Sequence, residues 1–85
     1  MKPQKQPINQ HLNKYLISTE LTPLLHVPEG SLFMYPGDNQ WIYELKIKLG
    51  NRCTALVKES EGNQFVGHLT MVPSSLEVHL VSYLN

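Results

Sequence analysis

The spacing of apolar residues changes near residue 30, and this change restricts the fold more than any other feature of the chain. Beyond that point apolar and polar residues alternate, and turn signals (PGDN, GN, EGN and PSS) recur about every ten residues. Such a pattern is typical of an antiparallel β-meander with one buried face. The predicted strands cover residues 31–35, 41–49, 53–59, 64–72 and 76–84.

The segment 41–49 shows the clearest alternation, with apolar side chains on one face and mostly charged ones on the other. The turn after it can be tested by parity, because residues directly opposite in an antiparallel pair share a face. A three-residue loop, residues 50–52, pairs Leu49 with Cys53 and keeps the apolar residues together, so this register is predicted. Gly50 instead favours a two-residue turn, and a β-bulge would reconcile the two.

Before the meander, residues 8–19 place apolar side chains three and four apart, which predicts a short amphipathic helix. Residues 1–7 hold lysines and prolines among glutamines and predict a flexible tail. The expected fold is therefore α+β: a short N-terminal helix packed on a four- to five-stranded antiparallel β-meander, with a curled half-barrel as a variant. Residues 8–85 are expected to form a single domain.

The C-terminal segment 74–84 fits two different elements. In one, a two-residue turn at Ser74 and Ser75 pairs it as a strand with the segment before it. In the other, Ser74 followed by Glu77 forms the capping box of a helix. The strand is predicted, because the valines and Tyr83 of this segment prefer a pleated surface.

Lysine plus arginine and aspartate plus glutamate each number 7, so the net charge is zero and gives no overall attraction to nucleic acid or anionic membranes. Polar residues interrupt every apolar stretch, which argues against a membrane span. The single cysteine, Cys53, excludes an internal disulfide, and the first residues lack the apolar run of a secretory signal. A cytoplasmic protein is expected.

No nucleotide-binding, zinc-binding or hydrolase motif occurs in the sequence. His68 and His79 are predicted to share an outward face, but two ligands do not make a zinc site. Cys53 beside Arg52 is interpreted as a small buried side chain rather than as a nucleophile. The sequence therefore predicts no enzyme, no cofactor and no metal site.

The first predicted strand is apolar on both faces, since Leu32 and Met34 point one way and Phe33 and Tyr35 the other. A strand without a polar face is either covered on both sides or forms an interaction surface. One helix covers only one face, so a contact with another chain is predicted. Its residues are Leu32, Phe33, Met34, Tyr35 and Ile42. The leading hypothesis is a non-catalytic accessory or regulatory protein that acts through protein–protein contact as a homodimer.

One alternative is a small apolar ligand bound in an aromatic-lined cup between helix and sheet. The residues predicted to line the cup are Tyr15, Trp41 and Tyr43. A further alternative is single-stranded nucleic-acid binding through a basic stripe. The residues of this stripe are Lys46, Lys48, Arg52 and Lys58. Trp41 and Tyr43 point away from these lysines, which weakens the nucleic-acid hypothesis.

The loop between Tyr35 and Trp41 decides how four aromatic side chains face. If these two residues pair directly, all four share the core face. If the four-residue loop PGDN joins the strands, Phe33 and Tyr35 turn outward while Trp41 and Tyr43 enter the core. The four-residue loop is predicted, because it builds naturally on a type I turn.

Overall fold

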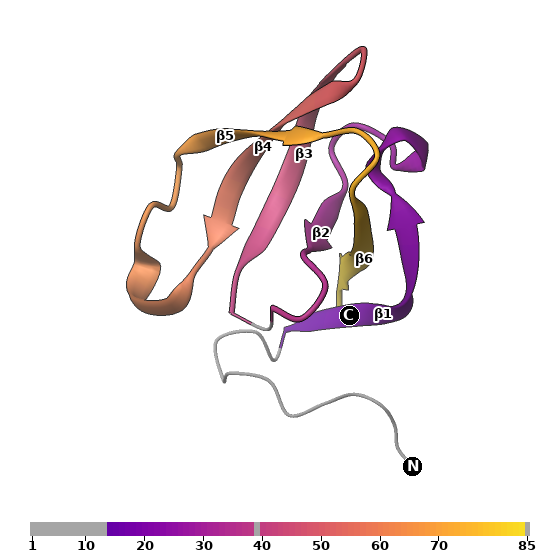
Figure 1. Cartoon of the computed structure of the whole chain (residues 1–85). Helices are drawn as coiled ribbons and strands as arrows, with labels where there is room; N and C mark the ends of the chain where they lie inside the picture. The colour runs from indigo at the N-terminus through magenta and orange to yellow at the C-terminus, as the bar shows by residue number, and fades with distance from the viewer. Residues whose placement is uncertain (1–13, 39, 85) are drawn as a thin grey trace.

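The computed structural model describes residues 14–38 and 40–84, so the predicted tail, residues 1–7, and residues 8–13 lie outside the described part. One antiparallel sheet of six strands has the order β1-β6-β2-β3-β4-β5. The strands are β1 (Tyr15–Pro23), β2 (Leu32–Met34), β3 (Ile42–Leu49), β4 (Arg52–Glu59), β5 (Leu69–Pro73) and β6 (Glu77–Tyr83). The helical elements of the described residues are two 3₁₀ turns, η2 (Leu24–His26) and η3 (Glu61–Asn63). In Figure 1 the sheet is strongly curled, so that β5 runs almost crosswise to β3.

The fold class is all-β rather than α+β, and the prediction of an N-terminal helix is wrong. The described part of the predicted helix belongs to β1. Tyr15 and Ile17 point to one face, whereas Leu16 is 55% exposed, which is the period of a strand. The helical spacing is overridden because Ile17 and the threonines of this segment favour extended backbone. Among the described residues, no helix is long and apolar enough to cross a membrane.

β1 bends in the middle, where its register against β6 shifts between Ile17 and Leu21. Ser18 fixes the bend: its Oγ accepts the N–H of Glu20 at 3.1 Å, and its carbonyl oxygen lies 2.9 Å from Nδ1 of His79. Figure 1 shows β1 turning sharply along its length. The bend carries the start of β1 over the second face of the sheet, where it packs against β2 and β3.

The turn between β3 and β4 has two residues, so the predicted three-residue loop is wrong. Leu49 pairs with Arg52, and Gly50 has the left-handed φ of 61° that favours glycine at the first position of such a turn. A bulge between Leu45 and Ile47 then changes which side chains of β3 face the core. As a result Ile47, which the alternation of residues 41–49 places on the apolar face, is 50% exposed.

The C-terminal segment forms strand β6, as predicted, but the predicted hairpin with β5 is wrong. β5 pairs with β4, whereas β6 lies between β1 and β2. Hydrogen bonds to other elements fix the segment between β5 and β6. The Ser74 N–H donates to the Asn51 carbonyl at 2.9 Å, and the Leu25 N–H donates to the Ser74 carbonyl at 3.0 Å. These bonds tie the connection to the β3–β4 turn and to η2, so the chain turns a corner there.

Apolar side chains are buried on both faces of the sheet. The inner face holds the larger cluster: Leu24, Val27, Phe33, Tyr43, Leu45, Cys53, Ala55, Val57, Val72 and Val78. The second face holds a smaller one: Tyr15, Leu32, Met34, Ile42 and Val81. The short strand β2 contributes side chains to both clusters.

β2 is therefore covered on both faces by its own chain. Leu32 is 7% exposed, Phe33 and Ile42 are 0% exposed, and Met34 is 2% exposed. Only Tyr35, the remaining residue of the predicted interface, is half-buried. The argument that one face of this strand needs a second chain is wrong, because the bent β1 supplies the second cover.

Candidate aromatic binding surface

Phe33 and Tyr43 stand opposite each other on β2 and β3, with their ring centroids 5.4 Å apart. In this register Tyr35 and Trp41 point to the same face, so the predicted four-residue loop is wrong. The Tyr35 ring stacks on Tyr43 at 4.6 Å, and the centroid of the Trp41 ring lies 6.2 Å from that of Tyr43. All four aromatic side chains share the inner face, and the predicted outward turn of Phe33 and Tyr35 does not occur.

The Asp38 carboxylate accounts for the longer loop. The Asp38 N–H donates to the Tyr35 carbonyl at 3.2 Å and closes a turn. Its Oδ1 then accepts the N–H of Gln40 at 2.8 Å, which is an Asx turn. The second turn carries the chain one residue further before β3 begins at Ile42, and this shift reverses the facing of Phe33 and Tyr35.

A further aromatic side chain comes from the loop between β4 and β5. The Phe65 ring stacks on Trp41 at 5.9 Å, and the His68 ring meets the Phe65 ring edge-on at 5.5 Å. The strand predicted over residues 64–72 is therefore only partly formed, since β5 begins at Leu69. Phe65 itself has a φ of 62°, a left-handed conformation that is rare for a bulky residue.

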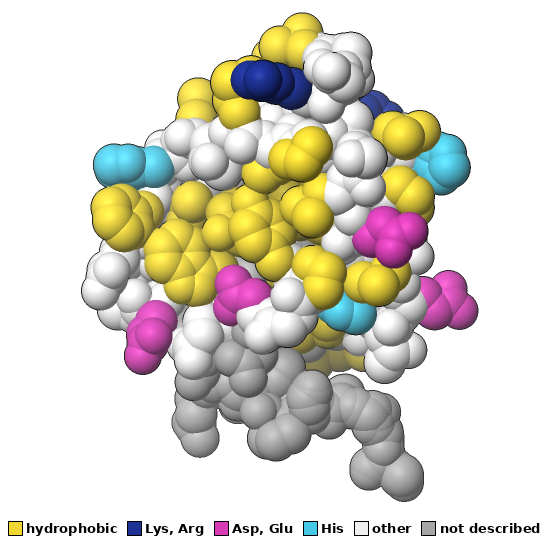
Figure 2. Space-filling view, in the orientation of Figure 1, with side chains coloured by type: hydrophobic (Ala, Val, Ile, Leu, Met, Phe, Trp, Pro, Cys, Tyr) yellow, Lys and Arg dark blue, Asp and Glu magenta, His cyan; other side chains and the backbone are white. Residues whose placement is uncertain are grey.

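These rings form a continuous row, which we call the aromatic platform: Phe33, Tyr35, Trp41, Tyr43 and Phe65. Exposure increases along the row. Phe33 is 0% and Tyr43 7% exposed, Tyr35 and Trp41 are half-buried, and Phe65 is 56% exposed. Figure 2 shows a contiguous hydrophobic area in the middle of this side of the molecule, with ring faces turned toward the viewer. The platform is thus anchored in the core at one end and open to solvent at the other.

The polar groups of the platform are the hydroxyls of Tyr35 and Tyr43 and the indole N–H of Trp41, and the Asp38 carboxylate lies in the loop at its edge. Burial raises the pKa of both hydroxyls, and the Asp38 carboxylate raises both further, whereas the neighbouring Tyr43 hydroxyl acts in the opposite direction on Tyr35. Both tyrosines are therefore neutral at physiological pH, and Asp38 supplies the charge at this edge of the platform.

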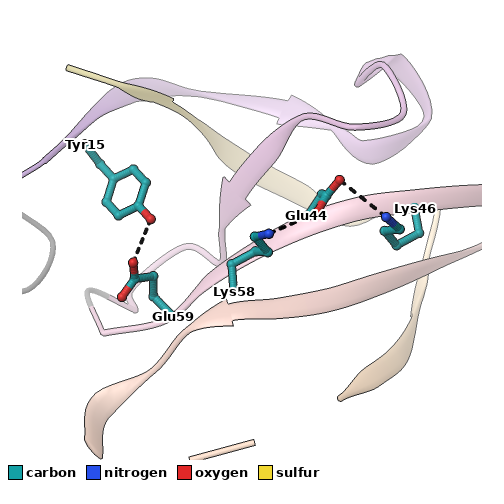
Figure 3. Close-up of polar contacts among 5 residues, drawn as sticks. All are labelled: Tyr15, Glu44, Lys46, Lys58 and Glu59. Carbon is teal, nitrogen blue, oxygen red and sulfur yellow. Dashed lines mark hydrogen bonds and ion pairs between the residues drawn. The ribbon is translucent and has the colours of Figure 1, made fainter. Parts of the chain in front are cut away.

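The basic residues of the predicted nucleic-acid stripe do not lie in one row. Lys46 and Lys58 each approach the carboxylate of Glu44 at 3.5 Å on the outer face (Figure 3). Nζ of Lys48 donates instead to a backbone carbonyl of η2 at 3.0 Å. Arg52 begins β4 beside the β3–β4 turn. The stripe is partly neutralised, and Lys46 and Lys58 are on the sheet face opposite to the platform.

The predicted ligand cup is only partly assembled. Trp41 and Tyr43 are neighbours on the platform, but Tyr15 belongs to the cluster on the second face. The Tyr15 hydroxyl donates to Oε2 of Glu59 at 2.8 Å (Figure 3), and its ring lies 5.3 Å from the ring of Tyr83. These contacts attach the start of β1 to the end of β4 and separate Tyr15 from the other two residues.

The histidines predicted to share a face are also separated. His68 lies at the end of the platform, whereas His79 bonds to the bent part of β1. Within residues 14–38 and 40–84, no group of three or more metal-ligating side chains occurs. Cys53 is 0% exposed, with its Sγ 3.4 Å from Oγ of Ser74, and the prediction of a small buried side chain is confirmed.

Sequence reasoning missed three residues of this surface: Asp38, Phe65 and His68. A signal for Phe65 was present, because Gly62 and Gly67 flank it and glycines mark loops. The alternation of apolar residues that continues into β5 outweighed it. Asp38 was interpreted only as part of a turn, although aspartate at such a position bonds to the backbone two residues on.

A second apolar area lies on the opposite face of the sheet. We call it the outer apolar stripe, formed by Ile47 (50% exposed), Leu69 (62%) and Met71 (55%). Thr54 pairs with Ile47 on one side and with Met71 on the other, so the stripe crosses β3, β4 and β5. β5 is an edge strand of the sheet, so the stripe reaches a free strand edge.

A cavity of about 320 Å³ lies where β1 is bent. Its lining residues are Leu16, Ser18, Ser31, Leu80, Val81 and Ser82. None of these side chains is ionisable, so this cavity offers no acid–base chemistry. The aromatic platform, which combines stacked rings with polar groups, is therefore the better candidate for a binding site than this cavity.

Comparisons of the chain with protein-family models, with curated protein sequences and with solved structures found no match. The fold and the platform define a small all-β protein with an exposed aromatic surface on one face of a curled sheet. Any function has to be inferred from that surface, because the fold alone does not specify one.

Proposed function

We propose that the protein is a non-catalytic binding module that holds a segment of a partner protein against the aromatic platform. The observation that carries this proposal is the conformation of Phe65, which combines a left-handed φ of 62° with 56% exposure. Backbone strain of this kind costs about 1–3 kcal/mol. A half-exposed ring recovers only part of the apolar burial that would offset this cost. Strain retained at an exposed aromatic residue supports a role in binding.

The side chains of the platform are suited to contact with a protein. Tryptophan, tyrosine and phenylalanine are enriched in the centres of protein interfaces, where they supply large and rigid contact areas. Half-buried Tyr35 and Trp41 provide an apolar centre, and Asp38 provides a polar edge. Small-ligand sites are concave and enclose most of the ligand. The open end of the platform at Phe65 therefore favours an extended segment over the small apolar ligand.

We further propose that this binding takes place in the cytoplasm. The only cysteine of the chain, Cys53, is a buried free thiol. A free thiol in a small domain is typical of a reducing compartment. Fractionation of cells that express the intact protein tests this location.

The proposed function is tested by comparing what the wild-type protein and two variants retain from a lysate. Phe65→Ala removes the exposed end of the platform, and Leu49→Ala removes a similarly exposed apolar side chain beside the β3–β4 turn. We expect a partner that the wild-type and Leu49→Ala proteins retain and the Phe65→Ala protein does not. Equal retention by both variants contradicts the proposal, provided that circular dichroism shows both to be folded.

A second candidate function is self-association through the outer apolar stripe. It is favoured by the exposure of Leu69 and Met71 on an edge strand, where a second copy could add to the sheet. Light scattering coupled to size exclusion tests it. A dimer that Met71→Lys converts to a monomer supports the candidate, and a wild-type monomer at all concentrations contradicts it.

A further inference from the structure

We propose that the partner segment presents a cationic side chain, an arginine or a lysine with or without methyl groups, to the aromatic platform. This inference rests on the proposed function. Aromatic ring faces carry the negative end of a quadrupole and attract cations within about 6 Å of the ring centroid. Neighbouring rings of the platform differ in plane by 13° to 29°, so their faces are nearly parallel. A planar guanidinium stacks well on faces arranged in this way.

The second step is the charge at the edge of the platform. The Asp38 N–H donates to the Tyr35 carbonyl at 3.2 Å, and the Asp38 carboxylate accepts the N–H of Gln40, the residue before Trp41, at 2.8 Å, so this carboxylate lies in the loop between two rings of the platform. Glu61 is exposed in η3, within the loop that carries Phe65. Figure 2 shows acidic side chains at the margin of the hydrophobic area, and lysine and arginine side chains farther away at the top. A cation on the rings therefore has carboxylates near it.

The third step is that the lysine and arginine side chains of the described residues lie away from the aromatic platform. Lys14 pairs with Glu59, Lys46 and Lys58 pair with Glu44, Lys48 bonds to η2, and Arg52 lies beside the β3–β4 turn. None of these contacts within residues 14–38 and 40–84 involves a ring of the platform. The aromatic faces and the acidic margin therefore complement a cation that comes from a partner.

The same charges disfavour nucleic acid on this surface. Rings on a sheet are able to stack on bases, but such sites add basic side chains that contact the phosphates. Here the carboxylate of Asp38 lies in the loop that joins Tyr35 to Trp41, and Lys46 and Lys58 are on the opposite face. A basic protein segment satisfies both the rings and the carboxylate, whereas a phosphate backbone is repelled.

The test uses a matched pair of capped Gly-Ser peptides that contain either one arginine or one citrulline, its neutral analogue. A third peptide contains trimethyllysine. Binding is measured on the intact protein by Trp41 fluorescence and by the NMR shift of its indole N–H, since Trp41 is the only tryptophan. We expect the arginine and trimethyllysine peptides to shift the Trp41 signals at millimolar concentration. We expect the citrulline peptide to leave these signals unchanged.

Two variants then separate the roles of ring and charge. Asp38→Asn is expected to weaken binding of the arginine peptide at least about threefold, and Phe65→Ala to weaken it about two- to fivefold. Leu49→Ala, beside the β3–β4 turn and outside both apolar surfaces, is expected to bind as the wild type does. Glu77→Gln, a change of the same charge on β6, is the matched control for Asp38→Asn.

Four outcomes overturn the inference. The first two are equal binding of the arginine and citrulline peptides and the absence of any Trp41 response to the peptides. The third is a stronger Trp41 response to an oligonucleotide than to a peptide. The fourth is a shift of the Trp41 signals, with no peptide present, when Lys2 and Lys5 are both changed to glutamine. The last outcome would assign the platform to the chain's own N-terminal residues. If Phe65→Ala abolishes partner retention while Asp38→Asn leaves it intact, the inference fails and the proposed function stands.

Discussion

The Phe65 ring lies 5.9 Å from the Trp41 ring, although one belongs to a loop and the other directly precedes β3. Trp41 stacks in turn on Tyr43, which is buried in the core. The most exposed ring of the platform is therefore linked to the interior by two successive ring contacts. This arrangement makes Trp41 a reporter for any molecule that binds at Phe65.

We predict that Phe65→Gly is more stable than Phe65→Ala by about 1 kcal/mol. Both changes remove the ring, but glycine adopts a φ of 62° without strain whereas alanine keeps a Cβ in the left-handed region. Urea denaturation of the two variants measures the difference in the free energy of unfolding. Equal stabilities would show that the backbone at residue 65 is not left-handed. Both variants are expected to lose the partner.

We predict that the protein loses stability as the pH rises above about 10. The pKa values of Tyr15, Tyr35 and Tyr43 are all raised, chiefly by burial, so the folded protein holds these phenolic protons more tightly than the unfolded chain. Stability is then fully present below the unfolded pKa and falls above it. Urea denaturation between about pH 9 and pH 11 measures this slope. The slope should be smaller in Tyr43→Phe, and an unchanged slope would contradict the burial of that hydroxyl.

We predict that Tyr15→Phe lowers the free energy of unfolding by about 1 kcal/mol. The change keeps the ring that packs near Tyr83 but removes the hydrogen bond to Glu59, which attaches β1 to β4. Lys14→Gln is the comparison, because it removes an exposed ion pair to the same carboxylate oxygen. Its expected effect is below about 0.5 kcal/mol. A larger loss of stability in Lys14→Gln than in Tyr15→Phe, measured by urea denaturation, would contradict this account of how β1 is attached to β4.

We predict that Ser74→Ala lowers the free energy of unfolding by about 1–2 kcal/mol, whereas Ser75→Ala changes it by less than about 0.5 kcal/mol. The Ser74 side chain is 5% exposed, and its Oγ donates to the Gly50 carbonyl at 3.0 Å. Ser75 is exposed. Thermal and urea unfolding of the two variants give the comparison. A loss of similar size in both would mean that the corner between β5 and β6 is not held through Ser74.

The strands with strong alternation were predictable from the sequence, since β3, β4 and β6 lie within the predicted ranges to about one residue. The prediction of an N-terminal helix was wrong because the sequence here fits two periods. Tyr15 and Leu16 follow Leu12 by three and four residues, as in a helix, but Tyr15 and Ile17 also lie two residues apart, as on one face of a strand. Periodicity alone does not decide between them in so short a segment. The preference of Ile17 and the threonines for extended backbone was the better guide.

The sheet order and the registers depend on interactions between distant parts of the chain. The bulge between Leu45 and Ile47 is the one that reconciles the two-residue turn at Gly50 with the apolar pattern, as the sequence suggested, whereas no local pattern specifies the bend of β1 at Ser18. The separation of β5 from β6 depends on Ser74 reaching the β3–β4 turn. These contacts exist only once the sheet has curled.

The candidate site was half predictable. The sequence showed four aromatic residues around one loop, but which face of the sheet they occupy depends on whether this loop has four or five residues. The Asx turn of Asp38 adds the fifth residue. Phe65 lies 24 positions after Trp41 in the sequence and joins the platform only through the fold. Aromatic composition thus indicated that a surface existed without indicating which residues form it.

The most direct test of the central claim is the emission of Trp41 before and after the retained partner is added. In the free protein we expect emission that acrylamide quenches, because Trp41 is only half-buried. With the partner, the emission should shift to shorter wavelength and lose its sensitivity to acrylamide, in the wild type and in Leu49→Ala but not in Phe65→Gly. Emission that the partner leaves unchanged in the wild type would contradict the assignment of the aromatic platform as the binding surface.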